Sequence, residues 1–186
     1  MLLPMFETVG SRRAALAALS LGCVVATMLQ LSCSRPPEAV AVGERAVPDF
    51  RLASLTGEAL GPSSFRGKVV VFDFWATWCL PCHLQADILK QLHAEFADSG
   101  VEFVAVSIGE PEETVREFVE RRPFPYPVLV DPSDEISVKL GIYGLPTVMV
   151  VDERGEVAYL RTGISPESVL RELLAGLTSR VAASSG

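Results

Sequence analysis

The sequence predicts an α/β domain in which helices flank both faces of one central mixed β-sheet. From residue 47 onward, short apolar runs typical of strands alternate with segments that have the apolar periodicity of helices. One run, residues 69–75, is rich in β-branched and aromatic side chains and predicts a buried central strand. The chain has 186 residues, enough for one such domain with a proper core and an appendage.

The domain is expected to open with a hairpin and a central strand. Residues 49–53 and 58–60, bridged by Thr56-Gly57, predict the hairpin, and residues 68–75 predict the strand. A helix is expected from about residue 81 to residue 97, with Gly100 as its stop. Its inner stripe is predicted to consist of Leu84, Ile88, Leu92 and Phe96.

The second half of the domain continues the alternation. Strands are expected at 101–107, 126–130, 147–151 and 156–160, with helices at 111–122 and 134–140. The helix at 111–122 carries acidic residues in its first turn and arginines in its last, which matches the helix dipole. Ser165-Pro166-Glu167 predicts the start of a final helix. Its sheet-facing residues are expected to be Val169, Leu170, Leu173, Leu174 and Leu177. Residues 47–180 would form the domain, and residues 181–186 a flexible tail.

The first 33 residues predict an export signal or membrane anchor. Residues 14–34 carry no charge and as a helix would span roughly 30 Å, about the thickness of a bilayer core. Arg12 and Arg13 precede this run, so the positive-inside rule places the N-terminus in the cytoplasm and the domain outside. Three fates stay open: a retained anchor, cleavage, or lipidation of Cys33, which follows Leu31-Ser32 as in bacterial lipoprotein signals. Residues 34–46 are expected to be a linker.

The overall charge excludes one class of partner. The formal net charge is -7, and no cluster of lysines or arginines offsets it. An acidic surface disfavours binding to nucleic acid phosphates. We therefore expect no nucleic-acid partner.

Cys79 and Cys82 are the candidate catalytic residues. They lie inside the globular pattern, directly after the buried strand, and two residues separate them. If a helix begins between them, the sulfur of Cys79 lies at its positive end, where a thiolate is stabilised. Cys79 is then the nucleophile, and Cys82, one turn further on, is the thiol that resolves a mixed disulfide.

Asp73 is the one carboxylate within the predicted central strand. Burial disfavours the charged form of a carboxyl group, so its pKa should rise toward neutrality. Asp73 would then be a proton acceptor for Cys82. The alternative is a solvated Asp73 at an edge of the sheet.

Gly144-Leu145-Pro146-Thr147 precedes an apolar strand. A proline at the first position of a strand is tolerated, which is the simpler interpretation. The other interpretation is a cis Leu145–Pro146 bond beside the disulfide, which leaves the backbone of Leu145 free to pair with a bound peptide. Spacing alone leaves both open.

Other kinds of site were weighed for the same residues. Residues 79–83 also spell the C-x-x-C-H pattern of c-type haem attachment, with His83 as one axial ligand and Met149 or His93 as the other. A Val-rich strand leading directly into the pattern is unusual for such a site. Zinc lacks a second Cys/His pair to complete four ligands. We therefore expect no metal and no cofactor, with a non-enzymatic haem or copper module as the weakest alternative.

Residues 72–82, together with residues 144–147, resemble thioredoxin. More narrowly, the chain resembles the membrane-tethered TlpA/ResA/CcmG (DsbE) branch over residues 42–177, through its 43–65 lead-in, the extra 110–131 segment and its N-terminal apolar run. The resemblance implies a thioredoxin fold with an N-terminal β-hairpin extension and an inserted helix and strand. It also implies a redox-active disulfide between Cys79 and Cys82, Asp73 as the buried carboxylate, and a substrate groove formed by Trp78, Leu145 and a cis Pro146.

Two positions depart from this branch, whose members often have an asparagine where this chain has Asp73. Proteins like ResA often have a glutamate three residues after the second cysteine, and here that residue is Gln85, which cannot titrate. The acid–base role is therefore expected to rest on Asp73, as in thioredoxin.

The resemblance implies a thiol–disulfide oxidoreductase of the bacterial cell envelope, with its domain in the periplasm or extracytoplasmic space. Its substrates would be exported proteins with cysteines, apocytochrome c among them, and its electrons would come from a membrane donor of the DsbD/CcdA type. The alternative enzyme is a thiol peroxidase, which shares the lead-in at residues 48–50. Such enzymes have a threonine three residues before the peroxidatic cysteine, where this chain has Ala76.

Overall fold

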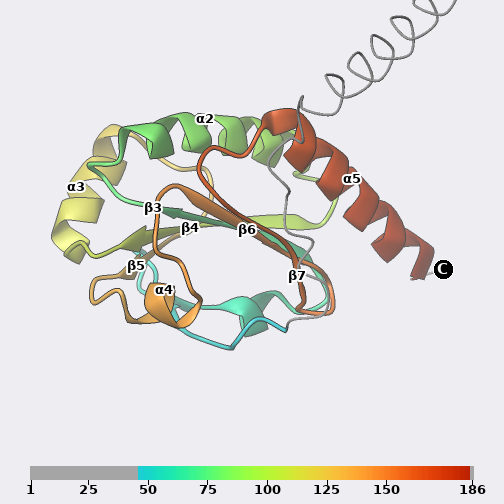
Figure 1. Cartoon of the computed structure of the whole chain (residues 1–186), viewed down its shortest axis with the longest axis horizontal. Coiled ribbons are helices and arrows are strands. Elements are labelled where there is room, and N and C mark those ends of the chain that lie inside the picture. Colours follow the sequence, from blue (N-terminus) through green and yellow to red (C-terminus); the bar gives the residue numbers. More distant parts are fainter. Residues whose placement is uncertain (1–45, 185–186) are drawn as a thin grey trace, which may run out of the picture. The chain divides into compact units, whose positions relative to one another are not determined.

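The computed structural model describes residues 46–184, which form a five-stranded sheet covered by helices (Figure 1). The expected leader, the lipidation candidate Cys33 and all but the last residue of the 34–46 linker lie outside this part of the chain. Within residues 46–184, no helix has the length and apolar character needed to cross a membrane.

The sheet is built around β3 (Val69–Trp75), in which every residue is buried. β3 pairs in parallel with β4 (Val101–Ile108) and antiparallel with β6 (Thr147–Val151). β5 (Val128–Asp131) lies parallel to β4, and β7 (Val157–Thr162) antiparallel to β6. The strand order is β5-β4-β3-β6-β7, which confirms the mixed sheet predicted from the sequence.

Two layers cover the two faces of this sheet. Helices α2 (Leu80–Glu95), α3 (Glu112–Arg121) and α5 (Glu167–Ser184) pack on one face, where Val71 and Trp75 point. The other face, lined by Phe72 and Phe74, is covered by α4 (Glu135–Lys139) and the 3-10 turn η1 (Pro62–Phe65). The hairpin of β1 (Leu52–Ala53) and β2 (Ala59–Leu60) also packs there. The expected opening hairpin is therefore confirmed.

The inner face of α2 differs from the predicted stripe. Leu92 and Phe96 are buried as predicted, but Leu84 is 57% exposed and Ile88 is only partly buried. The buried positions within the helix are Cys82, Gln85, Ala86, Leu89 and Leu92. Positions spaced by four residues drift by about 40° around a helix at each step, so they cannot all face one way. Cys82, Gln85, Leu89 and Leu92 follow one another at steps of three, four and three, with Ala86 beside them, so the buried residues stay on one face.

Helix α5 is longer than expected. Residues 181–184, predicted as the start of a flexible tail, continue the helix, and Val181 packs against the core. Alanines at 182 and 183 favour the helical conformation. Leu170, Leu174 and Leu177 are fully buried, as predicted, but Val169 is 40% exposed because it precedes the buried stripe by one position.

Candidate active site

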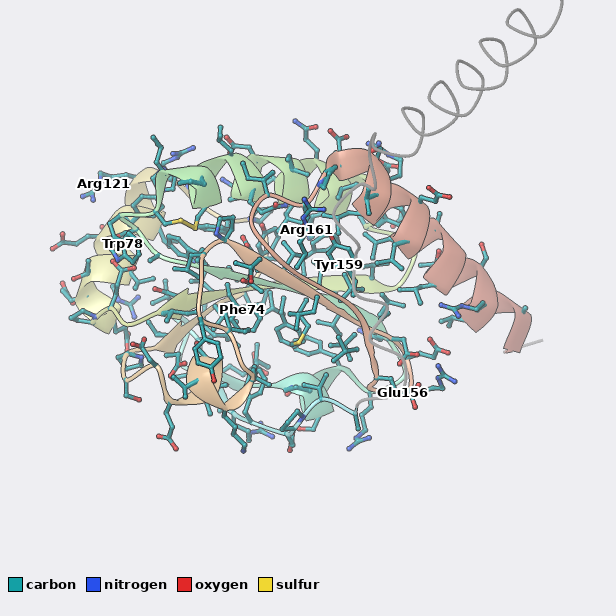
Figure 2. All side chains as sticks on the ribbon, viewed as in Figure 1. Phe74, Trp78, Arg121, Glu156, Tyr159 and Arg161 are labelled. Carbon is teal, nitrogen blue, oxygen red and sulfur yellow. A yellow bond between two sulfur atoms is a disulfide. The ribbon has the colours of Figure 1, made fainter. Side chains whose placement is uncertain are left out.

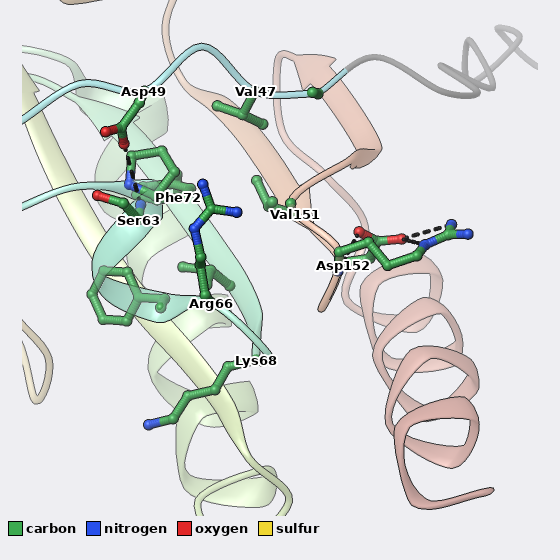
Figure 3. Close-up of a pocket in the computed structure, with 14 residues that line it drawn as sticks. Val47, Asp49, Ser63, Arg66, Lys68, Phe72, Val151 and Asp152 are labelled. Carbon is green, nitrogen blue, oxygen red and sulfur yellow. Dashed lines mark hydrogen bonds and ion pairs between the residues drawn. The ribbon is translucent and has the colours of Figure 1, made fainter. Parts of the chain in front are cut away.

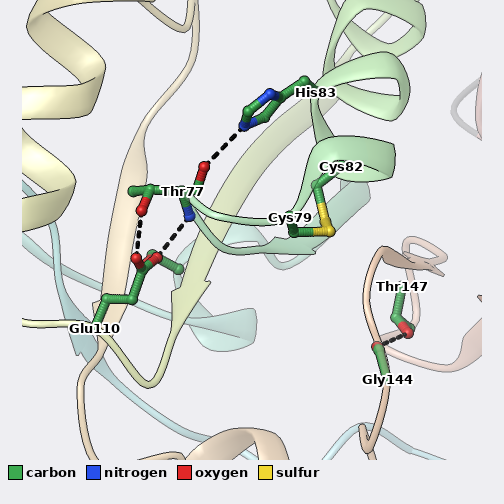
Figure 4. The surroundings of a disulfide bond; sticks show 8 residues. Thr77, Cys79, Cys82, His83, Glu110, Gly144 and Thr147 are labelled. Atoms are coloured by element: carbon green, nitrogen blue, oxygen red, sulfur yellow. Dashed lines mark hydrogen bonds between the residues drawn. A yellow bond between two sulfur atoms is a disulfide. The ribbon is translucent and has the colours of Figure 1, made fainter.

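The site is formed where β3 ends and α2 begins. After Trp75 the chain makes a short turn, and Cys79 becomes the N-cap of α2 with extended backbone angles. Pro81 lies in the first turn of the helix, where its missing N–H leaves no helical bond unmade. Cys79 and Cys82 form a disulfide with an S–S distance of 2.02 Å and a Cα–Cα distance of 5.3 Å (Figure 4).

The two cysteines have the relation to the helix that the sequence predicts. The helix begins between them, so the N–H groups of its first turn point toward Cys79. Such groups favour a thiolate on that sulfur once the disulfide is reduced. Cys79 is 3% exposed and Cys82 is 1% exposed, so both are covered and Cys82 lies deeper.

The Leu145–Pro146 peptide bond is cis, which decides between the two interpretations of this motif. Its loop is tied to its surroundings at two points: Gly163 N–H donates to the Pro146 carbonyl at 2.8 Å, and Thr147 Oγ1–H donates to the Gly144 carbonyl at 2.7 Å. In Figure 4 this loop lies opposite the disulfide. The structure thus brings together two motifs that are far apart in the sequence.

Large apolar side chains are exposed in the segments that form the site. Trp78 is 73% exposed and Leu80 is 72% exposed, on either side of Cys79, and Tyr143 is 82% exposed just before the cis-proline loop. Figure 2 shows Trp78 at the end of the molecule that carries the disulfide. Exposed aromatic side chains of this kind are typical of surfaces that contact other proteins.

Asp73 is fully buried on the face of β3 that α2 covers. It is 1% exposed, and neither of its carboxylate oxygens has a hydrogen-bond partner in the protein. Burial without compensation disfavours the charge and raises the pKa of Asp73 from 3.8 to about 8. The alternative of a solvated Asp73 is therefore wrong.

Tyr126 belongs to the same buried layer as Asp73. Its hydroxyl also lacks a hydrogen-bond partner in the protein, and its ring packs against Phe103 with 5.8 Å between centroids. Burial is the main cause that raises the pKa of Tyr126, and the negative charges of Asp73 and Asp87 raise it further. Asp73 and Tyr126 are thus polar groups shielded from solvent, and burial favours the protonated form of each.

Gln85 occupies the position where the related branch often has a glutamate, and it is also buried. Its Oε1 accepts a hydrogen bond from the Ser165 N–H at 2.6 Å, at the entry to α5. Gln85 therefore connects α2 to α5, and its amide carries no proton that it could release.

Glu110, which no sequence motif singles out, lies beside the active-site turn. Glu110 is 6% exposed, and Oε2 accepts a hydrogen bond from the Thr77 N–H at 2.7 Å (Figure 4). A signal was present in the sequence: a carboxylate directly after the strand parallel to the cysteine strand reaches the same edge of the sheet. That signal depends on knowing that β3 and β4 are neighbours.

The candidate axial ligands of a haem do not converge. The Nε2 atom of His83 lies 3.0 Å from the Thr77 carbonyl oxygen. Met149 is buried in the cluster on the opposite face of the sheet from Cys82. The ring of His93 packs against Phe103 and Tyr126 at centroid distances of 5.5 and 5.4 Å. The geometry therefore gives no support to the haem alternative.

A cavity lies near the start of β3, at the opposite end of this strand from the cysteines, which do not line it (Figure 3). Asp49 accepts a hydrogen bond there from the Ser63 N–H at 3.3 Å, and Asp152 is paired with Arg154 at 2.9 Å. The first contact joins the lead-in segment to η1, and the second lies within the turn between β6 and β7. The lead-in is linked to that turn by the Val47 N–H, which donates to the Gly155 carbonyl at 3.0 Å.

Known proteins are similar to this chain in sequence. The Redoxin family model matches residues 41–174. The thiol-disulfide oxidoreductase ResA of Geobacillus kaustophilus is 38% identical over 136 residues, which cover 73% of this chain and 78% of that protein. ResA of Bacillus subtilis is 30% identical over 137 residues, which cover 74% of this chain and 76% of that protein.

Solved structures agree with the sequence relatives. A thiol:disulfide interchange protein DsbE from Chlorobium tepidum superposes with a TM-score of 0.68 at 29% identity, covering 72% of this chain and 95% of that one. The MTB protein DsbF superposes with a TM-score of 0.63 at 27% identity, covering 69% and 94%. Fold, disulfide and relatives agree, and we conclude that the chain belongs to the Redoxin family and is a thiol–disulfide oxidoreductase with a thioredoxin fold, similar to ResA and DsbE.

Proposed function

We propose that the chain reduces disulfide bonds in exported proteins, with the cysteines of apocytochrome c as one candidate substrate. The single observation that carries the proposal is the Cys79–Cys82 disulfide at the N-terminus of α2. The cis Leu145–Pro146 bond and the buried Asp73 are consistent with it. The names of the relatives, ResA and DsbE, support exchange with protein disulfides.

In the first step, the Cys79 thiolate attacks one sulfur of the substrate disulfide. A mixed disulfide forms between Cys79 and the substrate, and the second substrate sulfur leaves as a thiolate. The dipole of α2 favours the attacking form, and the exposed Trp78 and Leu80 flank the point of attack.

In the second step, Cys82 resolves the mixed disulfide. Cys82 loses its proton to the Asp73 carboxylate and attacks the Cys79 sulfur, which releases the substrate as a thiolate. Two electrons have then passed from the Cys79–Cys82 pair to the substrate. Because the pKa of Asp73 is raised to about 8, its carboxylate form, which is the minority species at neutral pH, is basic enough to accept a thiol proton.

The leader gives the cellular setting of the proposal. Residues 14–34 would hold the domain on the outer side of the bacterial inner membrane, either as an anchor or through a lipidated Cys33. That compartment is oxidising, so the dithiol must be regenerated by a membrane electron donor of the DsbD/CcdA type.

Replacing the cysteines tests the mechanism. Cys79→Ser should abolish reduction of insulin disulfides by the dithiothreitol-charged protein, because the attacking sulfur is lost. Cys82→Ser should instead accumulate a mixed disulfide that survives non-reducing electrophoresis. Trapping in cells with this second variant would identify the substrates. If Cys79→Ser retained the activity of the wild type, the mechanism would be wrong.

A further inference from the structure

The turn that precedes Cys79 is held by a buried carboxylate from the loop that follows the neighbouring strand β4. Trp75 at the end of β3 is in register with Ser107 on β4, so the loops that follow both strands leave the sheet at the same edge. Glu110 lies three residues after Ser107 and is 6% exposed. The parallel pairing therefore brings an acid from outside the cysteine motif beside the active-site turn.

Glu110 contacts Thr77 through both of its oxygens. Oε2 accepts a hydrogen bond from the Thr77 N–H at 2.7 Å, and Oε1 accepts one from the Thr77 hydroxyl. The Ser107 hydroxyl, near the end of β4, also donates a hydrogen bond to Oε2 of Glu110 at 3.3 Å. Hydrogen bonds to a carboxylate are stronger than those between neutral groups, so this contact fixes both the backbone and the side chain of Thr77.

The remaining polar group of Thr77 is held from the other side. His83, in the first turns of α2, has its Nε2 atom 3.0 Å from the Thr77 carbonyl oxygen. A carbonyl oxygen only accepts hydrogen bonds, so Nε2 carries the proton. The N–H, the hydroxyl and the carbonyl of Thr77 are thus all engaged, by one residue after β4 and one residue on α2 (Figure 4).

We propose that Glu110 is a positioning residue for the thiol–disulfide exchange, acting through Thr77 to hold Cys79 within reach of Cys82. Holding two reacting groups in the right geometry raises their effective concentration and so favours the bond between them. The role of Glu110 in catalysis rests on the proposed function. Its effect on the two cysteines does not, because their effective concentration is measurable without any protein substrate.

The test is an equilibrium with glutathione. The protein dithiol reduces glutathione disulfide: the Cys79–Cys82 bond forms, the glutathione S–S bond breaks, and two electrons and two protons pass to give two glutathione thiols. The oxidised fraction of the detergent-solubilised full-length protein is measured by thiol alkylation across a series of glutathione buffers. We expect Glu110→Ala to lower the equilibrium constant for forming the protein disulfide by about tenfold, through lost preorganisation.

The conservative variant separates hydrogen bonding from charge. In Glu110→Gln the amide oxygen accepts from the Thr77 N–H, and the amide NH2 donates to the Thr77 hydroxyl, so the geometry is kept and the charge is lost. We expect its equilibrium constant to stay within about twofold of the wild type. An equal shift in the Gln and Ala variants would assign the effect to charge and overturn the positioning role.

Two further variants keep the outcome interpretable. Glu112→Ala removes an acid from the same segment, one that is exposed and paired with Arg116, and it should leave the constant unchanged. Thr77→Val removes one of the two Glu110 contacts and should shift the constant in the same direction by about threefold, even if Glu110→Ala fails to fold. The proposal would be refuted if both Glu110→Ala and Thr77→Val had the equilibrium constant of the wild type. If Glu110→Ala does not fold, a wild-type constant in Thr77→Val alone would refute it. Failure of the wild type to reduce insulin would count against the proposed function only.

Discussion

At the scale of single residues, Asp73 is a carboxylic acid buried in a strand without hydrogen bonds that would offset its loss of hydration. Both of its oxygens lack hydrogen-bond partners in the protein, and it lies between Ala105 of β4 and Val148 of β6. Such a group destabilises the fold whenever it is ionised, since burial penalises the charge. A costly buried carboxylate beneath the helix that carries a reactive cysteine pair is expected where proton transfer is part of the chemistry.

Asp73→Asn should therefore flatten the pH dependence of stability. The pKa of Asp73 is about 8 in the folded protein and near 4 in the unfolded chain, so the folded protein binds more protons between these values. The free energy of unfolding then falls as pH rises from about 4 to about 8, by roughly 1.4 kcal/mol per unit, or on the order of 3 kcal/mol between pH 5 and pH 7. Urea unfolding of the oxidised protein at pH 5 and pH 7 measures this difference.

The matched control for that measurement is Asp87→Asn on the exposed side of α2, where the acid is 53% exposed. It should retain the slope of the wild type. A slope in Asp73→Asn equal to that of the wild type would show that Asp73 does not titrate in this range.

At the scale of elements, the site depends on how α2 is fixed to the rest of the layer. Leu89 and Leu92 bury its inner face. Gln85 provides a buried polar link by accepting the Ser165 N–H just before α5, and Glu95 forms an exposed ion pair with Arg171 of α5 at 2.9 Å. Ser165 is itself fully buried, and its hydroxyl accepts a hydrogen bond from the Tyr159 hydroxyl at 3.1 Å. The helix that carries both cysteines is therefore held by apolar packing and by one buried hydrogen bond across the layer.

Removing this bond should lower stability but leave the disulfide chemistry in place. Gln85→Ala leaves the Ser165 N–H buried without a partner, which costs about 1–3 kcal/mol in the free energy of unfolding. Gln91→Ala, at an exposed position of the same helix, should change it by less than about 0.5 kcal/mol. Chemical denaturation compares the two variants, and equal stabilities would mean that the Gln85 contact contributes nothing.

At the scale of the whole molecule, the two ends of the domain differ in character. The end with the disulfide exposes Trp78, and the turn between β6 and β7, which bears Glu156, lies at the opposite end (Figure 2). At the latter end Arg154 is paired with Asp152 and Glu156, and the chain enters through Ala46, which bridges to Glu156. The reactive end is therefore the end that offers apolar surface to a partner.

The combined substitution Trp78→Ala and Tyr143→Ala should impair reduction of protein disulfides more than that of small ones. Aromatic side chains at the centre of a contact surface often contribute 2 kcal/mol or more to binding, so kcat/KM for insulin should fall by about tenfold or more. Reduction of a small aromatic disulfide should change by less than about twofold, because the cysteines and Asp73 are untouched.

Val138→Ala serves as the control for this pair of substitutions, since it removes an exposed apolar side chain from α4, on the other face of the sheet. It should match the wild type with both substrates. An equal loss with both substrates in the aromatic variant would indicate damage to the cysteine site itself.

The elements and the reacting sulfurs are predictable from the amino-acid sequence alone, because both depend on short stretches of chain. The β-branched run of β3, the proline in the first turn of α2 and the spacing of the two cysteines act within a few residues of each other. The exposure of Leu84 and the helical state of residues 181–184 were missed, since neighbouring elements decide which side of a helix is covered and where it frays.

The groups that come to those sulfurs from distant parts of the chain could not be predicted, because strand pairing brings them there. Pairing of β3 with β4 brings Glu110 to Thr77, and pairing of β3 with β6 brings the cis-proline loop to the same edge of the sheet. The uncompensated burial of Asp73 likewise follows from having a strand on each side and a helix above. Strand order depends on contacts between residues far apart in sequence, and periodicity within one element carries no information about them.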